Sequence, residues 1–381
     1  MSSTAAMPTP SYLDWNATAP LRPEAAAAMT AALAHCGNPS SVHRWGRAAR
    51  RIIEEARAAV AGLLSAKPEG VVFTSGGTEA NHLGLLGCGR ARVLVSAVEH
   101  DSVLRAVPHA ERIPVDSGGV VRLDALAATL AADPRPAVVS VMLANNETGV
   151  MQPVSEVAAI THAHGALFHC DAVQAAGRLP LDIAAIGADL VSLSAHKLGG
   201  PTGVGALVMA DTVDLMPLQR GGGQEHGYRA GTENFVGIAA FAAAAKAAAA
   251  EIAVYDRVRR LRDALEAAIA AAAPEAVVIG AGVRRLPNTT AVAIPGIPAE
   301  TQVIALDLDG VLVSAGAACS SGKVGPSHVL AAMRAPPEIA SSTIRVSLGW
   351  NSSEGEIAHF LRAWTALRRR CRELAERRHA A

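Results

Sequence analysis

The sequence predicts an α/β fold made of a large domain and a smaller one. Short apolar runs rich in β-branched residues alternate with longer helical stretches along the 381-residue chain. Several of these runs stop abruptly at glycine, asparagine or charged residues, and ligands of open α/β sheets sit beyond the carboxyl ends of strands. A chain of this length accommodates two domains of ordinary size.

The composition limits the class of protein. Half of the residues are apolar, and much of that share is alanine, which favours helix. The 34 basic residues balance the 34 acidic ones, which argues against a nucleic-acid partner held by bulk charge. The most apolar stretch, 239–254, is interrupted by Lys246 and Glu251 and is too short to span a membrane. We therefore expect neither a nucleic acid nor a membrane as partner.

The beginning of the sequence and its cysteines indicate a compartment. No basic patch followed by an apolar run opens the sequence, so we expect no secretory signal. The cysteines are odd in number, scattered, and without a pair at metal-ligand spacing. Such a set suits a reducing cytoplasm, and we expect a cytoplasmic protein. The five are Cys36, Cys88, Cys170, Cys319 and Cys371.

Two helices are predicted ahead of the first strand. Pro20 and Pro23 frame the first, and the second covers about 42–65. The second begins with several basic residues, which oppose the helix dipole. A solvated face explains them, with an anion site or subunit contact as the alternative.

A phosphate cradle is predicted after the strand at 71–75. Gly76 and Gly77 allow close approach of the backbone, the following helix presents free N–H groups, and Thr78 adds a hydroxyl. The Walker lysine and the spaced glycines of a dinucleotide site are missing, which argues against a nucleotide. A tight strand–helix turn would have the same sequence.

Two further strands end in polar residues. The strand at 93–96 leads to His100, which is either structural or able to stack on a ring and shuttle protons near neutral pH. The strand at 138–144 ends in Asn145 and Asn146, which a simple turn would also explain. A helix from Pro153 to about residue 164 follows.

Asp171 and Gln174 follow the strand at 166–170. A carboxylate in this position can pair with a protonated pyridine nitrogen and keep the ring an electron sink. Gln174 could then donate to a phenolic oxygen on the same ring. The alternative role of Asp171 is to cap a helix.

Lys197 follows the next strand, which begins near Asp189, and Ser194 and His196 flank it. A lysine at a strand's carboxyl end can be desolvated, and the lowered pKa makes its amine a nucleophile for an aldehyde such as pyridoxal phosphate. A lone surface lysine is the alternative, but the cradle and Asp171 supply what a phosphorylated pyridine needs.

Beyond the strand at 205–209 lies a glycine-rich loop, 221–232, of a length typical of functional segments. An alanine-rich helical tract over about 235–273 then leads to the second domain. That domain is predicted to contain strands at 291–294, 311–313 and 343–348, a helix at 300–308 and a last helix at about 353–380.

Two residues of the second domain are candidates for chemistry. Cys319 lies among small residues, which favours an exposed and reactive thiol. Arg345 alternates with Ile344 and Val346, so it lies on the opposite face of its strand. An arginine there suits capture of a carboxylate, and a structural salt bridge fits equally.

Together these stretches resemble the cysteine desulfurases of the nitrogen-fixation and housekeeping iron–sulfur type, in the class V branch of fold type I pyridoxal-phosphate enzymes. The resemblance covers about residues 12–361. The matching stretches are GNPSSVH, FTSGGTEAN, the pair EH at 99–100, NNETGV, HCDAVQ, SLSAHKLGGPTGVGAL, GGGQEHGYRAGTEN, SAGAACSSGKVGPSHVL and TIRVSLGW. Gly77 stands where the family often has alanine.

The resemblance implies a role for each matching residue. Lys197 would bind pyridoxal phosphate covalently, Asp171 would pair with the ring nitrogen and Gln174 with the ring oxygen, while His100 would stack on the ring and serve as the nearest base. Gly77, Thr78, Ser194 and His196 would hold the phosphate, and Thr232 would reach that of a neighbouring subunit. Asn146 and Arg345 would bind the substrate carboxylate. Cys319 would take the sulfur and could ligate an iron–sulfur cluster transiently.

The resemblance also implies the architecture and the partners. We expect a large domain over 22–252 with a mixed, mostly parallel seven-stranded sheet between helices, and a smaller α/β domain from 1–21 and 253–381. We expect a homodimer with shared sites that acts on L-cysteine and passes sulfur to an acceptor or scaffold protein. The alternatives are selenocysteine lysis, another class V reaction, and a non-catalytic sulfur carrier that needs Cys319 but not Lys197.

Overall fold

The computed structural model describes residues 10–210, 213–316 and 327–379, and the chain divides into two compact units. The larger unit contains residues 18–146 and 150–253. The smaller unit consists of the described parts of 1–17, 147–149 and 254–381. Each unit has its own sheet and its own buried core.

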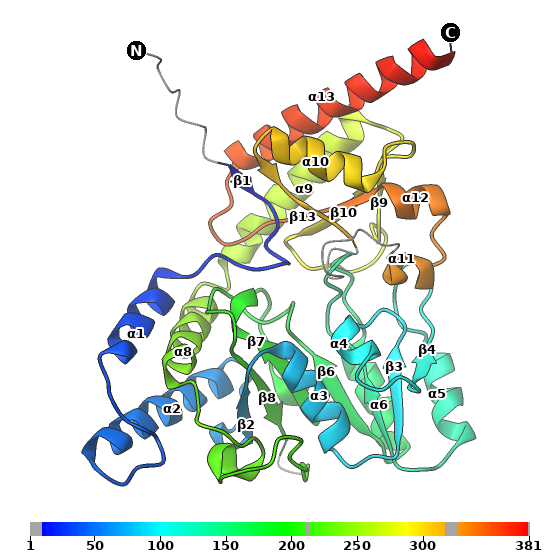
Figure 1. The fold of residues 1–381 in the computed structure, drawn as a ribbon. Coiled ribbons are helices and arrows are strands. Elements are labelled where there is room, and N and C mark those ends of the chain that lie inside the picture. Colours follow the sequence, from blue (N-terminus) through cyan, green and yellow to red (C-terminus); the bar gives the residue numbers. More distant parts are fainter. Residues whose placement is uncertain (1–9, 211–212, 317–326, 380–381) are drawn as a thin grey trace, which may run out of the picture. The chain divides into compact units, whose positions relative to one another are not determined.

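The larger unit is organised around a seven-stranded sheet with the order β2-β8-β7-β6-β5-β3-β4 (Figure 1). β8 is antiparallel to both β2 and β7, whereas the pairs among β7, β6, β5, β3 and β4 are parallel. This confirms the predicted mixed, mostly parallel sheet. The strands are β2 (Val71–Thr74), β3 (Arg92–Ser96), β4 (Glu111–Ile113), β5 (Ala137–Ser140), β6 (Leu167–Asp171), β7 (Leu190–Ser194) and β8 (Gly205–Met209).

The helices of the larger unit cover the sheet. They are α1 (Pro23–Leu33), α2 (Arg44–Gly62), α3 (Gly77–Gly87), α4 (Asp101–Leu104), α5 (Leu123–Ala132), α6 (Val154–Ala163), α7 (Ile183–Ile186) and α8 (Phe235–Ala250). Helices α1 and α2 both pack against α8 (Figure 1). The buried side of α8 includes Ala240, Ala244 and Ala248, whose small side chains allow neighbouring helices to approach closely.

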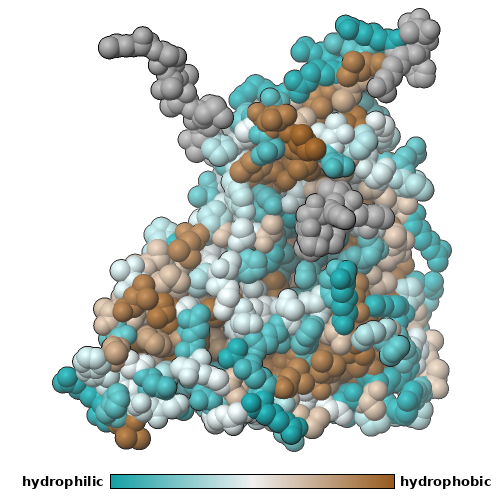
Figure 2. All heavy atoms as spheres, viewed as in Figure 1, coloured by the Kyte–Doolittle hydropathy of each residue, from teal (hydrophilic) through white to brown (hydrophobic). Residues whose placement is uncertain are grey.

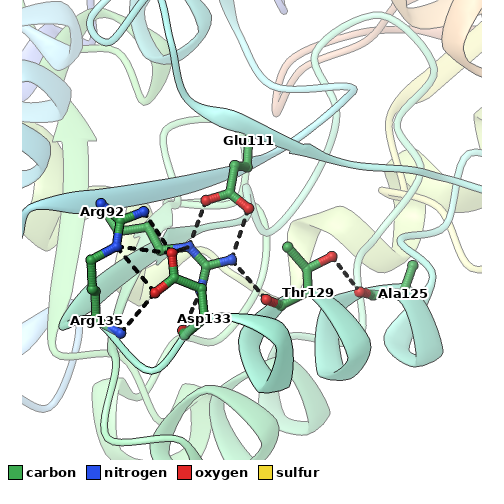
Figure 3. A network of polar contacts seen from close by, with 6 residues as sticks. All are labelled: Arg92, Glu111, Ala125, Thr129, Asp133 and Arg135. Atoms are coloured by element: carbon green, nitrogen blue, oxygen red, sulfur yellow. Dashed lines mark hydrogen bonds and ion pairs between the residues drawn. The ribbon is translucent and has the colours of Figure 1, made fainter.

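The sheet is braced at the start of β3, away from its carboxyl edge. The Arg92 guanidinium pairs with both oxygens of Glu111, at 2.5 and 2.7 Å, and so joins β3 to β4 (Figure 3). It also donates to the backbone carbonyls of Thr129 and Asp133, each at 2.7 Å. One buried arginine therefore fixes the edge strand β4 and the end of α5.

The smaller unit contains a sheet in the order β12-β13-β10-β9 and a parallel pair, β1-β11. Its strands are β1 (Ser11–Tyr12), β9 (Val277–Val278), β10 (Thr289–Ala293), β11 (Val311–Leu312), β12 (Ser314–Ala315) and β13 (Thr343–Ser347). Its helices are α9 (Val254–Ala272), α10 (Ala299–Leu308), α11 (His328–Ala332), α12 (Pro337–Ser342) and α13 (Glu354–His379). The core includes the fully buried Phe360 and Trp364 of α13, whose rings stack.

The tract at 235–273 forms two helices, α8 and α9, because residues 251–253 are not helical at the crossing from the larger to the smaller unit. Within the described ranges, no helix taken alone is both long and apolar enough to cross a bilayer, although α8 and α9 pass that test as a bent pair. Hydrophobic side chains gather at the surface over α10, where Ile304 and Leu308 are exposed (Figure 2).

Candidate active site

The candidate residues of the larger unit follow four parallel strands. His100 comes after β3, Asn146 after β5, and Lys197 after β7, while Asp171 is the last residue of β6. Because β3, β5, β6 and β7 pair in parallel, their carboxyl ends share one edge of the sheet. The structure thus places these four residues along one edge, where open α/β sheets bind ligands.

Lys197 lies in a single 3-10 turn, Ala195–Lys197, directly after β7, and its side chain is half-buried. The backbone of this turn is held in place, because the carbonyl of His196 accepts the N–H of Ala19 at 2.8 Å and that of Gly199 accepts Arg22 at 2.9 Å. Gly199 has a φ of +91°, which L side chains rarely adopt. The amine therefore projects from a rigid support.

His196, beside the lysine, is neutral at physiological pH. Its Nδ1 lies 3.1 Å from the hydroxyl of Thr18. Burial, together with the positive charges of Lys197 and Arg178, lowers the pKa of His196 to about 4. A neutral imidazole can still donate a hydrogen bond to an anion.

The stretch predicted to be a phosphate cradle lies where α3 begins. A Cβ placed on Gly77 would lie 3.4 Å from the Cβ of Ser194 and 3.0 Å from Cγ2 of Val173. The first turn of α3 and the end of β7 are therefore in close contact, and Thr78 beside them is exposed. Free N–H groups of a helix start next to a serine hydroxyl fit a phosphate group. Because a Cβ at position 77 would come within 3.0 Å of Val173, glycine fits at this position more easily than a residue with a side chain.

The Asp171 carboxylate is buried, with 6% of the residue exposed, and held by donors on both oxygens. The backbone N–H of Val173 donates to Oδ1 at 3.0 Å, and the Asn81 amide donates to Oδ2 at 2.8 Å. These two donors fix the orientation of the carboxylate, and a carboxylate in this place can pair with a protonated pyridine. The donor set therefore fits the ring of pyridoxal phosphate.

Gln174 is oriented by a residue that the sequence did not single out. The buried Arg178 donates to the side-chain oxygen of Gln174 and to its backbone carbonyl, the latter at 3.0 Å. With its oxygen accepting from Arg178, any further hydrogen bond from the Gln174 side chain is donated by its NH₂ group. That matches the predicted donation to a ring oxygen.

His100 is half-buried and caps the short helix α4, since its Nδ1 accepts the backbone N–H of Ser102 at 3.1 Å. Of the two neighbouring asparagines, Asn145 is fully buried and donates to the carbonyl of Val98 at 2.9 Å. Asn146 is half-buried. Asn145 therefore holds the loop, and Asn146 stays the predicted ligand contact of the two.

The buried Glu99, which follows β3, also holds the loop beyond β5. Its Oε1 accepts the backbone N–H of Met142 at 2.6 Å, and burial raises the pKa of Glu99 well above its usual range. Glu99, Asn81, Ser102 and Arg178 are positioning residues that sequence reasoning missed. The available signal was a polar residue on the buried side of a helix that opens with glycine, as for Asn81 one turn after Gly77.

Arg345, in the smaller unit, is buried on β13 and pairs with Asp14 at 2.7 Å between Nη2 and Oδ1. The hydroxyl of Ser314 donates to the other oxygen of Asp14 at 2.8 Å. The salt bridge considered from the sequence is thus present.

Thr232 is exposed on its loop, and Cys319 lies outside the described residues. Across the described ranges, no three histidine, cysteine or acidic side chains form a group that could hold a metal ion.

A seven-stranded α/β sheet with a lysine, a donor-supported aspartate and a helix-start cradle at its carboxyl edge defines a fold type I pyridoxal-phosphate enzyme. The family model described as aminotransferase class-V matches residues 11–360, and the chain belongs to this family. The resemblance inferred from the sequence is confirmed.

Within the family, the chain is similar to cysteine desulfurases. It is 46% identical to the cysteine desulfurase of Cereibacter sphaeroides, over 92% of this chain and 93% of that protein. It is 39% identical to the cysteine desulfurase IscS of Dictyoglomus turgidum, with 92% of each covered. The crystal structure of a NifS-like protein from Rickettsia africae matches with a TM-score of 0.88 and 35% identity, over 94% of this chain and 99% of that one.

Proposed function

We propose that this chain is a pyridoxal-phosphate-dependent cysteine desulfurase that converts L-cysteine to L-alanine and leaves a persulfide on Cys319. The observation that carries the proposal is the common sheet edge occupied by Lys197 and the donor-supported Asp171. The names of the relatives support the same reaction class. Acceptor proteins would take the sulfur for iron–sulfur cluster assembly or tRNA thiolation.

The cofactor would be held by residues of the larger unit. Lys197 forms the covalent link, Asp171 pairs with the ring nitrogen, Gln174 donates to the ring oxygen and His100 stacks on the ring. The bound ring supplies an electron sink for the Cα–H bond of the substrate. Asn146 contacts both ring and substrate, and the phosphate is held by Gly77, Thr78, Ser194 and His196.

The remaining steps belong to four side chains. Arg345, with Asn146, binds the substrate carboxylate and orients the Cα–H bond. The amine of Lys197 takes the proton from Cα. The thiolate of Cys319 then forms an S–S bond to the substrate sulfur as the C–S bond breaks. The electron pair of that bond stays on the carbon skeleton, which takes up a proton at Cβ, regains one at Cα and leaves as alanine.

The proposal includes a homodimer with shared sites and a cytoplasmic location. Thr232 is exposed on the larger unit, which supports a role at the phosphate of a neighbouring subunit. A transient cluster ligand at Cys319 would follow from sulfur delivery to a scaffold.

Two substitutions and one control test the reaction. Cys319→Ala should abolish persulfide and sulfide formation from L-cysteine while cofactor absorbance remains, because only the sulfur acceptor is removed. Lys197→Ala should eliminate the borohydride-reducible link between protein and cofactor. Cys36→Ala removes an exposed thiol that has no role in the proposal and should retain activity. Alanine and sulfide are measured together.

The outcomes separate the alternatives. Alanine formation that persists at the normal rate in Cys319→Ala would point to a different class V reaction. Sulfur transfer that persists in Lys197→Ala would point to a carrier. Faster turnover of selenocysteine than cysteine by the wild type would indicate a selenocysteine lyase.

A further inference from the structure

We infer that Asn81 and Ser102 form a hydrogen-bond relay from Asp171 to His100, and that this relay fixes His100 as a donor at Nε2. The inference deepens the proposed function and rests on it, because Asp171 and His100 are the proposed partners of the cofactor ring. All four residues belong to the larger unit.

The first link of the relay is the buried amide of Asn81, a residue that is 1% exposed. Its Nδ2 donates to Asp171 Oδ2 at 2.8 Å and to Ser102 Oγ at 2.9 Å. The opposite orientation of the amide would place its oxygen against the Asp171 carboxylate, which has no hydrogen to donate, and would lose that bond. In the observed orientation, Oδ1 of Asn81 is buried without a hydrogen-bond partner among the described residues. The Asp171 carboxylate thus imposes the orientation of the amide, although burying Oδ1 without a partner costs free energy.

The second link is the hydroxyl of Ser102. The backbone N–H of Ser102 makes Nδ1 of His100 an acceptor, so the hydroxyl, which accepts from Asn81 and lies 2.8 Å from Nδ1, directs its own hydrogen to that nitrogen. That backbone N–H donates to Nδ1 at 3.1 Å. A nitrogen that accepts from two donors carries no hydrogen. The neutral His100 ring therefore has its hydrogen on Nε2.

This tautomer changes what His100 can do. A ring with hydrogen on Nε2 donates from that atom and does not accept a proton there. Service as a base at Nε2 would require hydrogen on Nδ1, in conflict with both donors of Ser102. His100 accordingly acts as a stacked hydrogen-bond donor, and another group deprotonates Cys319. Asn81 and Ser102 are positioning residues for both ring partners.

The cofactor-free protein tests the relay directly. With ¹⁵N-labelled histidine at about pH 8, where an ordinary histidine is neutral, two-bond ¹H–¹⁵N spectra distinguish the tautomers. We expect the Nδ1 signal of His100 to be that of an unprotonated nitrogen. Asn81→Leu and Ser102→Ala should both shift this signal. The matched control is Ser140→Ala, which removes a buried hydroxyl 2.8 Å from His169 Nδ1 and should leave His100 unchanged.

Cofactor binding supplies the second measurement. Asn81→Leu should weaken pyridoxal-phosphate binding about tenfold through loss of a hydrogen bond to a charged group. A wild-type His100 with hydrogen on Nδ1 would overturn the relay, as would an Asn81→Leu spectrum identical to that of Ser140→Ala. If Asn81→Leu does not fold, the ¹H–¹⁵N spectra of the wild type and of Ser102→Ala still test the relay. Failure of the wild type to bind the cofactor would overturn the proposed function, while the spectra would still judge the relay.

Discussion

Three successive residues at the end of β6 occupy three different environments. His169 lies between the hydroxyls of Ser140 and Ser192, at 2.8 and 2.9 Å, and is fully buried. Burial lowers the pKa of His169 to about 4. Burial also raises the pKa of the Cys170 thiol well above its usual range, so this cysteine stays protonated and unreactive. Of the three, Asp171 is the last residue of the strand and lies at the carboxyl edge of the sheet.

The low pKa of His169 predicts how stability depends on pH. As pH falls below about 6.5, the unfolded chain binds a proton before the folded one does. The stabilising contribution is therefore complete above that pH and is lost as pH falls towards the folded value of about 4. From about pH 7 to about pH 5 the loss from this residue is about 2 kcal/mol.

Urea unfolding of His169→Gln measures this contribution. The variant should lose less of its apparent unfolding free energy than the wild type over the same pH interval. Some dependence should remain, since the pKa of His196 is lowered to about 4 as well. The exposed His109→Gln is the control and should follow the wild type. Identical slopes for wild type and His169→Gln would contradict the assignment.

At the scale of elements, the glycine-rich loop is anchored at two points. The buried Glu225 accepts from Arg57 at 2.8 and 3.0 Å and from the backbone N–H of Phe73 at 2.8 Å. Glu225 has a φ of +46°, a strained value for a non-glycine residue. Four residues later, Arg229 pairs with Glu79 of α3 at 2.9 Å. These anchors attach the loop that carries Thr232 to α2, β2 and α3.

Removal of one member of the buried pair should be more harmful than removal of both. Arg57→Met leaves the Glu225 carboxylate buried without its counterion and should lower the unfolding free energy by about 3–5 kcal/mol. The double variant Arg57→Met/Glu225→Met should recover much of that loss. Arg50→Met, which breaks an exposed pair with Glu54, should cost at most about 0.5 kcal/mol. Denaturant titration gives all three values, and equal losses in the single and double variants would refute the expectation.

The elements that sequence reasoning found share a strong local signal. Strands such as β2 and β8 are continuous apolar runs ended by polar residues or glycine. The edge strands β4 and β9 were not predicted, because they are only 3 and 2 residues long and depend on pairing with a neighbour. Helix α5 was also missed, although Leu126 and Leu130 are buried one turn apart. Local pattern is weak where tertiary contacts decide the structure.

At the scale of the whole molecule, the residues of the site also divide into those with a local sequence signal and those that depend on partners far away in the sequence. Lys197, Asp171 and His100 were found because each follows a recognisable strand. Asn81 was not found, because its partner Asp171 lies 90 residues away in the sequence. Arg345 was singled out, but its pairing with Asp14, 331 residues away, has no local signal. Partners that meet only through the fold require the structure.

Mixed oligomers test whether sites are shared between subunits. If Thr232 serves the phosphate of a neighbour, Thr232→Val and Lys197→Ala should each be inactive alone. A dimer formed from one subunit of each then contains one site with both residues intact. Equal mixing after denaturation and refolding should thus restore about a quarter of wild-type activity per subunit.

The controls for this experiment are the separately refolded variants. Activity of the mixture that does not exceed the mean of the two would show that Thr232 acts within its own subunit. Refolded wild type sets the scale, and size-exclusion chromatography reports whether dimers have formed.

The pairing of β1 has a consequence for biosynthesis. Ser11 and Tyr12 lie in register with Val311 and Leu312, and Asp14 bridges to Ser347. These residues precede the larger unit in the chain, whereas their backbone partners are translated after it. The larger unit ends at residue 253 and can complete its sheet while the nascent chain is still growing. Residues 11–14 therefore cannot form these pairs until the strands at 311–312 and 343–347 have been made.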